Sequence, residues 1–211
     1  MSKSIYITGT GPRSGKSVVV LGVMELLARH GRRIGFFRPV VDKDPISDHL
    51  VALVMSRYDI TAPQEIMFGV SHASDRNLIS KDKEDELHSR ILEKYGALKQ
   101  VCDFVVCVGT DYKTMHTALE FEFNVEVARN LGTPLMPVVA GQGRKVGEIV
   151  NAVRELAESL EEKKCDVLSM IVNRVVPDDV TEAVARFQEG SPAGVPVFVL
   201  PVHPLLDKLT V

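Results

Sequence analysis

A glycine, a lysine and a serine in succession carry the clearest chemistry of this sequence, in the stretch "TGTGPRSGKSVV" from Thr8 to Val19. A glycine-rich turn between a strand and a helix lets successive backbone N–H groups converge on a phosphate, and the positive end of the helix dipole adds to the attraction. In such a turn the lysine reaches the outer phosphates and the serine hydroxyl takes one position on Mg²⁺. We therefore predict a phosphate-binding loop in which Lys16 and Ser17 have these roles.

The glycines of this loop do not follow the usual spacing, G-x4-G-K-S/T, which would place a glycine at position 10. Thr10 stands there instead, between Gly9 and Gly11, and the loop reads G-x5-G-K-S. The strand-like residues before the loop and the apolar helix expected after it favour a phosphate-binding loop (P-loop) over a chance occurrence of these letters. The residues that we expect around the phosphates are Gly9, Thr10, Gly11, Arg13, Ser14, Gly15, Lys16, Ser17 and Val18.

The composition is that of a folded protein with no general attraction to polyanions. The chain has 211 residues, of which 45% are hydrophobic and 25% are charged, and its net charge is -3. This length and balance favour one folded domain, residues 1–211. Because the chain is weakly acidic, any anion site must be local, and we expect no nucleic-acid partner.

The sequence has no feature that indicates export or membrane insertion. The first residues lack the apolar core of a signal peptide. The most apolar stretch, Val18 to Leu27, is too short to span a bilayer and is interrupted by a glycine and a glutamate. The three cysteines form no C-x-x-C pair, so reduced, buried thiols are the favoured interpretation. We expect a cytoplasmic chain with no membrane partner, and we also expect a homo-oligomer.

Short runs of β-branched residues alternate with amphipathic stretches along the chain. Several of the runs, such as "FVVCV" and "PVFVL", are apolar at nearly every residue, as strands covered on both faces of a parallel sheet must be. The expected strands are residues 4–8, 34–40, 104–108, 135–139, 167–172 and 195–200. The expected helices are residues 16–30, 47–57, 84–100, 125–131, 146–163 and 178–189.

This alternation predicts an α/β fold, with a three-layer, doubly wound and mostly parallel sheet. In such sheets ligands bind beyond the carboxyl ends of the strands, and the glycine-rich loop follows the first expected strand. Residues 59–83 are less regular and richer in polar side chains. We interpret them as an insertion over the edge of the sheet.

The loop "TGTGPRSGKS" resembles the P-loop of dethiobiotin synthetase, which has the same offset between its first glycine and its lysine. "FFRPV" resembles the K-P-V of that family, with Arg38 in place of the lysine, and "ISDHLVAL" resembles its S-D-A-L, with Asp48 where the family has a metal-binding aspartate. "IVNRV" resembles the segment whose asparagine, here Asn173, faces the adenine, and "LPVHP", from Pro201, falls where the family closes over the base.

The resemblance implies a P-loop NTPase of the dethiobiotin synthetase type that binds ATP or a related nucleotide, with Mg²⁺ as a possible second cofactor. It adds Arg38, Asn173 and Pro201 to the nucleotide-binding residues. Ser17 and Asp48 are the expected metal ligands, and Asp111 could reach the metal through a water molecule.

The N-terminal domain of the long form of phosphate acetyltransferase resembles this chain over essentially its full length. The segments that carry this resemblance are "RRIGFFRPVV", "IMFGV", "EDELHSRILEKY", "DFVVCVGTDY" and "VLPVHPLLDKLTV". In that family a C-terminal domain interconverts acetyl-CoA plus phosphate and acetyl phosphate plus CoA. The resemblance implies that residues 201–211 begin a linker, and that C-terminal acetyltransferase domains are the partners of this chain.

One position departs from both patterns in a way that bears on catalysis. "VVCVGTDY" resembles the E-G-A-G of dethiobiotin synthetase, but Val108 stands where the glutamate would help to hold Mg²⁺. Since Mg²⁺ takes few protein oxygens and several waters, the loss of one carboxylate weakens such a site without abolishing it. Arg38 can bind a phosphate or pair with Asp42 or Asp44, and the sequence leaves these two roles open.

Three functions fit these observations. The first is a non-catalytic nucleotide-binding domain with a regulatory or assembly role in a phosphate acetyltransferase. The second is a stand-alone ATP-dependent ligase that resembles dethiobiotin synthetase. The third is a partner-binding module with a vestigial loop, which would bind no nucleotide.

Overall fold

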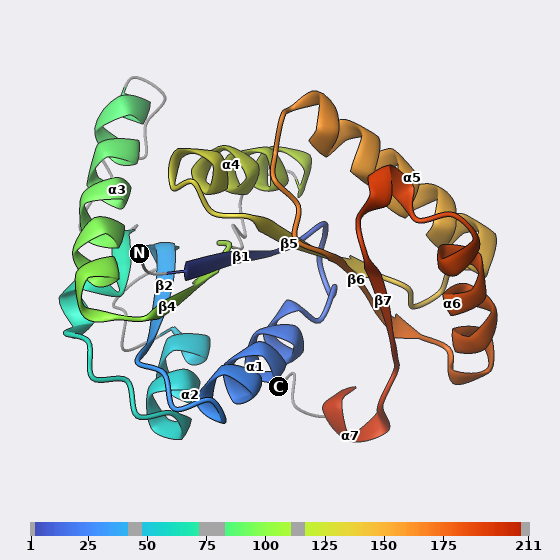
Figure 1. Cartoon of the computed structure of the whole chain (residues 1–211), viewed down its shortest axis with the longest axis horizontal. Coiled ribbons are helices and arrows are strands. Elements are labelled where there is room, and N and C mark those ends of the chain that lie inside the picture. The colour runs from blue at the N-terminus through green and yellow to red at the C-terminus, as the bar shows by residue number, and fades with distance from the viewer. Residues whose placement is uncertain (1–2, 42–47, 72–82, 111–116, 208–211) are drawn as a thin grey trace.

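The computed structural model describes residues 3–41, 48–71, 83–110 and 117–207, and these form one seven-stranded sheet with helices on both faces (Figure 1). The strands lie in the order β3-β2-β4-β1-β5-β6-β7, and every neighbouring pair is parallel. The strands are β1 (Lys3–Gly9), β2 (Ile34–Val41), β3 (Phe68–Ser71), β4 (Phe104–Val108), β5 (Leu135–Ala140), β6 (Met170–Val175) and β7 (Val197–Pro201).

The helices form the two outer layers. In Figure 1, α1 and α2 lie on one side of the sheet, and α4 and α5 lie on the other. None of the helices within the described ranges is long and apolar enough to cross a membrane. The helices are α1 (Lys16–Ala28), α2 (His49–Arg57), α3 (Glu84–Val101), α4 (Thr117–Asn130), α5 (Val146–Glu162), α6 (Val180–Glu189) and α7 (Pro204–Asp207), with the short 3-10 turns η2 (Gln64–Ile66), η4 (Pro177–Asp179) and η5 (Pro192–Gly194).

Two hydrophobic cores lie on opposite faces of the sheet, because successive side chains of a strand point to opposite faces. In β1, Ile5 and Ile7 join the core beneath α1 and α2, whereas Tyr6 joins the larger core beneath α3, α4, α5 and α6. In β4, Cys107 belongs to the larger core and Val108 to the smaller one. This alternation puts Val108 on the same face of the sheet as α1.

The predicted fold is confirmed: the sheet is parallel and doubly wound, and the chain has three layers. The list of strands was incomplete, since β3 lies within residues 59–83 and pairs with β2 at the edge of the sheet. β3 has only four residues, "FGVS", and one of them is a glycine, so the run is too short and too weakly β-forming to stand out. That these residues are an insertion stays a prediction.

The start of α4 was also predicted wrongly. The expected helix began at residue 125, whereas α4 begins at Thr117. The first half of the helix reads "TALEFEFN", in which apolar and acidic residues alternate as they do in a half-buried strand. Phe121 and Phe123 pack against the larger core from the helix, so tertiary contacts override the local pattern.

Candidate phosphate-binding site

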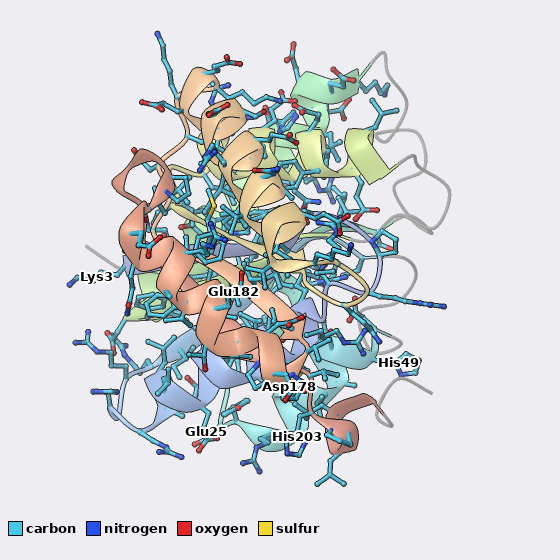
Figure 2. All side chains as sticks on the ribbon, turned by 90° about the vertical axis from the view of Figure 1, so that its right-hand side faces the viewer. Lys3, Glu25, His49, Asp178, Glu182 and His203 are labelled. Atoms are coloured by element: carbon cyan, nitrogen blue, oxygen red, sulfur yellow. The ribbon has the colours of Figure 1, made fainter. Side chains whose placement is uncertain are left out.

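The glycine-rich loop lies at the carboxyl edge of the sheet, between β1 and α1. Figure 2 labels Lys3, which begins β1, on one side of the molecule, and His49, which follows the carboxyl end of β2, on the other side. The backbone N–H of Thr10 donates to the carbonyl oxygen of Val138 at 3.0 Å, which anchors the loop to β5. The loop therefore occupies the edge at which ligands bind in parallel sheets.

Gly15 directs the chain from the loop into α1. It precedes the helix with φ 75°, in the left-handed region that a residue with a Cβ seldom adopts. Among the described residues no side chain caps α1, and the first turn of the helix holds no acidic residue. The positive end of the helix dipole thus faces the loop without a neutralising carboxylate, as an anion site at a helix N-terminus requires.

The end of β6 holds the loop from the side. The Asn173 side-chain amide donates to the carbonyl oxygens of Ser14, at 2.9 Å, and of Gly15, at 3.4 Å. The guanidinium of Arg174 donates to the carbonyl oxygen of Arg13 at 3.2 Å. Asn173 was predicted to face an adenine, and that role stays a prediction. In this structure its amide fixes the backbone of the loop.

Lys16 reaches across the site to the turn after β4. Its ammonium nitrogen Nζ donates to the carbonyl oxygen of Gly109 at 2.6 Å, and the residue is only 5% exposed. The guanidinium of Arg38, at the middle of β2, donates to the same oxygen at 3.3 Å. Two cationic side chains therefore converge on one backbone carbonyl beside the glycine-rich loop.

Arg38 forms an ion pair with Asp48. The guanidinium nitrogen Nη2 lies 3.2 Å from Oδ2 of Asp48, and the two side chains are 9% and 12% exposed. The other carboxylate oxygen of Asp48 accepts from the backbone N–H groups of Leu50 and Val51, so Asp48 is also the N-cap of α2. The sequence-based alternatives for the partner of Arg38, Asp42 and Asp44, lie outside the described residues.

Val108 is fully buried at the end of β4. Its neighbour in β1 is Ile7, and both side chains belong to the core beneath α1 and α2. The side chain of a glutamate at this position would lie on the face of the sheet that α1 covers, and α1 begins at Lys16. The valine offers no oxygen to a metal or a water molecule there.

The described residues offer few ligands to Mg²⁺. The hydroxyl of Ser17, at the start of α1, is exposed and could bind the ion, but Asp48 already has contacts to both of its carboxylate oxygens and Val108 offers none. Asp111 lies outside the described residues. Within the part of the chain that is described, no three His, Cys, Asp or Glu side chains are grouped so that they could hold a metal ion.

Asn124 supports the site and was missed by sequence reasoning. This fully buried residue of α4 accepts from the Tyr6 hydroxyl at 2.8 Å and from the backbone N–H of Thr110 at 2.9 Å. Its amide donates to the carbonyl oxygens of Thr110 and Glu120. Asn124 thus fixes the turn that carries Gly109. Its only sequence signal is an amide in an otherwise apolar and acidic run.

Of the remaining predicted residues, Gly9 and Pro201 lie at the ends of their strands, Gly11 lies in the loop, and Val18 lies in the first turn of α1. Gly9 ends β1 and is buried, and the backbone N–H of Val18 donates to the carbonyl oxygen of Gly15 at 3.0 Å. Pro201 ends β7 beside Val175 of β6 and is exposed. The structure thus groups Lys16 and Arg38 closely, whereas Pro201 stands at the far edge strand of the sheet.

Comparisons with known proteins agree with this architecture. A family model described as "AAA domain" matches residues 3–210. The phosphate acetyltransferase of Nitratidesulfovibrio vulgaris is 38% identical over 185 residues, which are 87% of this chain and 26% of that protein. The ATP-dependent dethiobiotin synthetase of a Sulfurovum species is 29% identical over 152 residues, which are 66% of this chain and 69% of the synthetase.

A solved structure extends the likeness to the level of the fold. The septum site-determining protein MinD of Pyrococcus horikoshii, in complex with Mg-ADP, has a TM-score of 0.55 and 16% identity, over 99% of this chain and 84% of MinD. The chain spans about a quarter of the length of the phosphate acetyltransferases that it matches. Because the family model covers nearly all of the residues, the chain belongs to the AAA-domain family of P-loop proteins.

Proposed function

We propose that this chain binds ATP or a related nucleotide through residues 9–18, turns it over slowly or not at all, and has a regulatory or assembly role in a phosphate acetyltransferase. The observation that carries the proposal is the position of Lys16. Lys16 begins α1, and its ammonium nitrogen lies 2.6 Å from the carbonyl oxygen of Gly109, which follows β4 directly after Val108. This arrangement supports both phosphate binding and weak catalysis.

Nucleotide binding is supported by the charges and dipoles around the loop. A phosphate beside Gly15 would meet the uncapped N-terminus of α1 and the ammonium group of Lys16. A hydrogen bond from Lys16 to an ionised phosphate is stronger than its present bond to a neutral carbonyl. The exchange of one acceptor for the other therefore favours the bound state.

Slow turnover is supported by the residue at position 108 and by the contacts of Asp48. Hydrolysis of a nucleotide needs groups that stabilise the charge on the transferred phosphoryl group and orient the attacking water. Val108 supplies neither, and Asp48 is engaged by Arg38 and by the N-terminus of α2. Lys16 and Arg38 can hold phosphates, which accounts for binding but not for activation of a water molecule.

The role in a phosphate acetyltransferase is supported by the relatives. Proteins of that name match 83% or more of this chain, and the chain spans about a quarter of their length. We infer that the acetyl transfer is performed by C-terminal domains of a longer chain, to which residues 201–211 begin the linker. The homo-oligomer and the cytoplasmic location belong to the same proposal.

A stand-alone ATP-dependent ligase is the second candidate, because a dethiobiotin synthetase also matches two thirds of this chain. Lys16 and Ser17 are compatible with that activity, whereas Val108 opposes it. A ligase of this kind would form a product from ATP, CO₂ and a diamino acid. Formation of such a product by the wild-type chain, and its loss in Lys16→Ala, would replace the main proposal with this one.

The main proposal is tested by measuring nucleotide binding and phosphate release in the same sample. We expect the chain to bind ATP while releasing phosphate no faster than a protein-free blank. Addition of ATP should also change the rate of acetyl phosphate formation by the full-length acetyltransferase. Fast phosphate release that Lys16→Ala abolishes would contradict the slow or absent turnover, and an unchanged acetyl transfer rate would contradict the regulatory role.

A further inference from the structure

We propose that this site binds its nucleotide without the help of Mg²⁺, because Val108 replaces one expected carboxylate ligand, Asp48 is held by other groups, and Lys16 and Arg38 offer donors to the phosphates. The inference rests on the proposed nucleotide binding and specifies the ligand as a nucleotide phosphate free of bound metal. It is carried by three features: the environment of Val108, the contacts of Asp48, and the convergence of Lys16 and Arg38.

Valine stands at position 108, at the end of β4, where a metal-binding carboxylate was expected. The side chain is fully buried among the apolar residues beneath α1 and α2, beside Ile7. A buried isopropyl group can neither coordinate Mg²⁺ nor hold one of its water molecules, since Mg²⁺ is bound through oxygen ligands and ordered waters. The strand end next to the loop therefore contributes nothing to a metal site.

Asp48 is unavailable because both of its oxygens already have partners. Oδ1 accepts from two backbone N–H groups at 3.0 and 3.1 Å, and Oδ2 is paired with Arg38 at 3.2 Å. Transfer of this carboxylate to Mg²⁺ would leave the guanidinium of Arg38, which is 9% exposed, without its counterion. Removing one partner of a buried ion pair is strongly unfavourable. The Arg38–Asp48 pair thus competes with the metal for the same ligand.

Lys16 supplies a positive charge beside the loop, and Arg38, whose own charge is balanced by Asp48, adds N–H donors. Both donate to the carbonyl oxygen of Gly109, which is a single neutral acceptor. Nε of Arg38 is buried and has no hydrogen-bond partner among the described residues. A phosphate oxygen is a better acceptor than a carbonyl for such groups, and a guanidinium can offer it two parallel N–H groups.

The first experiment compares the affinity of the wild-type chain for ATP in excess Mg²⁺ and in EDTA, by isothermal titration. We expect the two dissociation constants to agree within about threefold, which is less than 1 kcal/mol. Binding that is tighter in Mg²⁺ by more than about threefold would overturn the inference. If Asp111→Asn then removed that advantage, Asp111 would be identified as the ligand responsible.

The second experiment restores the missing carboxylate. Val108→Glu should make ATP binding tighter in Mg²⁺ than in EDTA, by about tenfold or more, whereas the uncharged Val108→Gln should not. Glutamine matches glutamate in shape and buries a similar polar group. A comparison of the two variants therefore distinguishes the effect of the negative charge from the effect of a polar side chain on the core. Equal behaviour of the two variants would overturn the role given to Val108. If neither folds, the wild-type comparison decides alone.

The two proposals fail in different ways. Binding in Mg²⁺ but not in EDTA would overturn the metal-free inference and leave the proposed nucleotide binding intact. An absence of binding in both conditions would overturn the nucleotide-binding function, and the inference with it.

Discussion

Lys16 donates a hydrogen bond from its ammonium nitrogen to the carbonyl oxygen of Gly109 at 2.6 Å, across 93 residues of sequence. This contact joins the loop after β1 to the turn after β4. Arg38 from β2 donates to the same oxygen. Groups on or directly after three neighbouring strands, β2, β4 and β1, therefore meet at the Gly109 carbonyl. A phosphate that binds Lys16 must compete with the Gly109 carbonyl, and the position of that carbonyl therefore matters for the affinity of the site.

Asn124 holds the turn that carries Gly109, and its removal should destabilise the protein. Asn124→Ala leaves the Tyr6 hydroxyl and the backbone N–H of Thr110 without their buried acceptor. Since an unpaired buried N–H of Thr110 costs about 1–3 kcal/mol and the other hydrogen bonds of Asn124 are also lost, we expect the free energy of unfolding to fall by about 2–4 kcal/mol. Urea denaturation would measure this change.

The matched control for this substitution is Asn130→Ala, which removes an exposed asparagine from the last residue of the same helix. Its effect should stay within about 0.5 kcal/mol, as for most surface substitutions. Equal losses in Asn124→Ala and Asn130→Ala would contradict the structural role of Asn124.

Gly15 should not tolerate a side chain. Its φ is 75°, and a Cβ built on it would lie 2.2 Å from the side-chain nitrogen of Asn173. Gly15→Ala should therefore lower the free energy of unfolding by at least about 1–2 kcal/mol, the cost of the left-handed conformation alone, and should weaken ATP binding. Thermal unfolding and titration with ATP would check both effects.

Two further variants separate the causes. Gly147→Ala, in the first turn of α5, meets no atom within 4 Å and should be neutral or slightly stabilising. In an Asn173→Ala background, Gly15→Ala should no longer lose stability through the clash with the Asn173 side chain. The loss of stability caused by the left-handed backbone at position 15 should remain. If Gly15→Ala were as well tolerated as Gly147→Ala, the loop geometry described here would be wrong.

The sequence was sufficient to predict the α/β fold and the place of the glycine-rich loop, because both depend on local patterns. Apolar runs marked six of the strands, and the letters around Lys16 marked the turn into α1. The acceptor of Lys16 could not be predicted, since any residue supplies a backbone carbonyl. The partner of Arg38 could not be predicted from the sequence either, because its pairing with Asp48 depends on how β2 and α2 pack.

Asn124 shows a further limit of sequence-based reasoning. The residue lies in the alternating first half of α4, where the local pattern is typical of a strand. Its four hydrogen bonds join β1, α4 and the turn after β4, and they exist only once these elements are assembled. A buried amide in such a position has no local sequence signature.

The Arg33–Asp103 pair should make stability depend on pH in the acid range. Three hydrogen bonds from the backbone and guanidinium of Arg33 lower the pKa of Asp103 from 3.8 to about 2. Because the pKa is lower in the folded chain, the contribution of Asp103 is complete above 3.8 and is lost as the pH falls toward 2. Unfolding by urea at several pH values would show this loss.

Asp103→Asn should remove that part of the pH dependence, and Arg33→Gln should do the same because it removes the partner. The double variant should behave like either single variant, as expected for two groups that act as one pair. A pH profile that is unchanged in Asp103→Asn would show that other carboxylates govern the acid range. The pair is exposed, so a small amplitude is expected.

The central claim is that the glycine-rich loop binds nucleotide phosphates through Lys16, and isothermal titration with ATP tests it most directly. Lys16→Ala should weaken binding at least about tenfold, since a charge-assisted hydrogen bond contributes about 1.5–3 kcal/mol. Lys16→Met, which keeps most of the buried stem, should show the same loss. Lys94→Ala, which removes a lysine from α3, should bind ATP as the wild type does. Equal affinities of the wild type and Lys16→Ala, or no binding by the wild type, would contradict the claim.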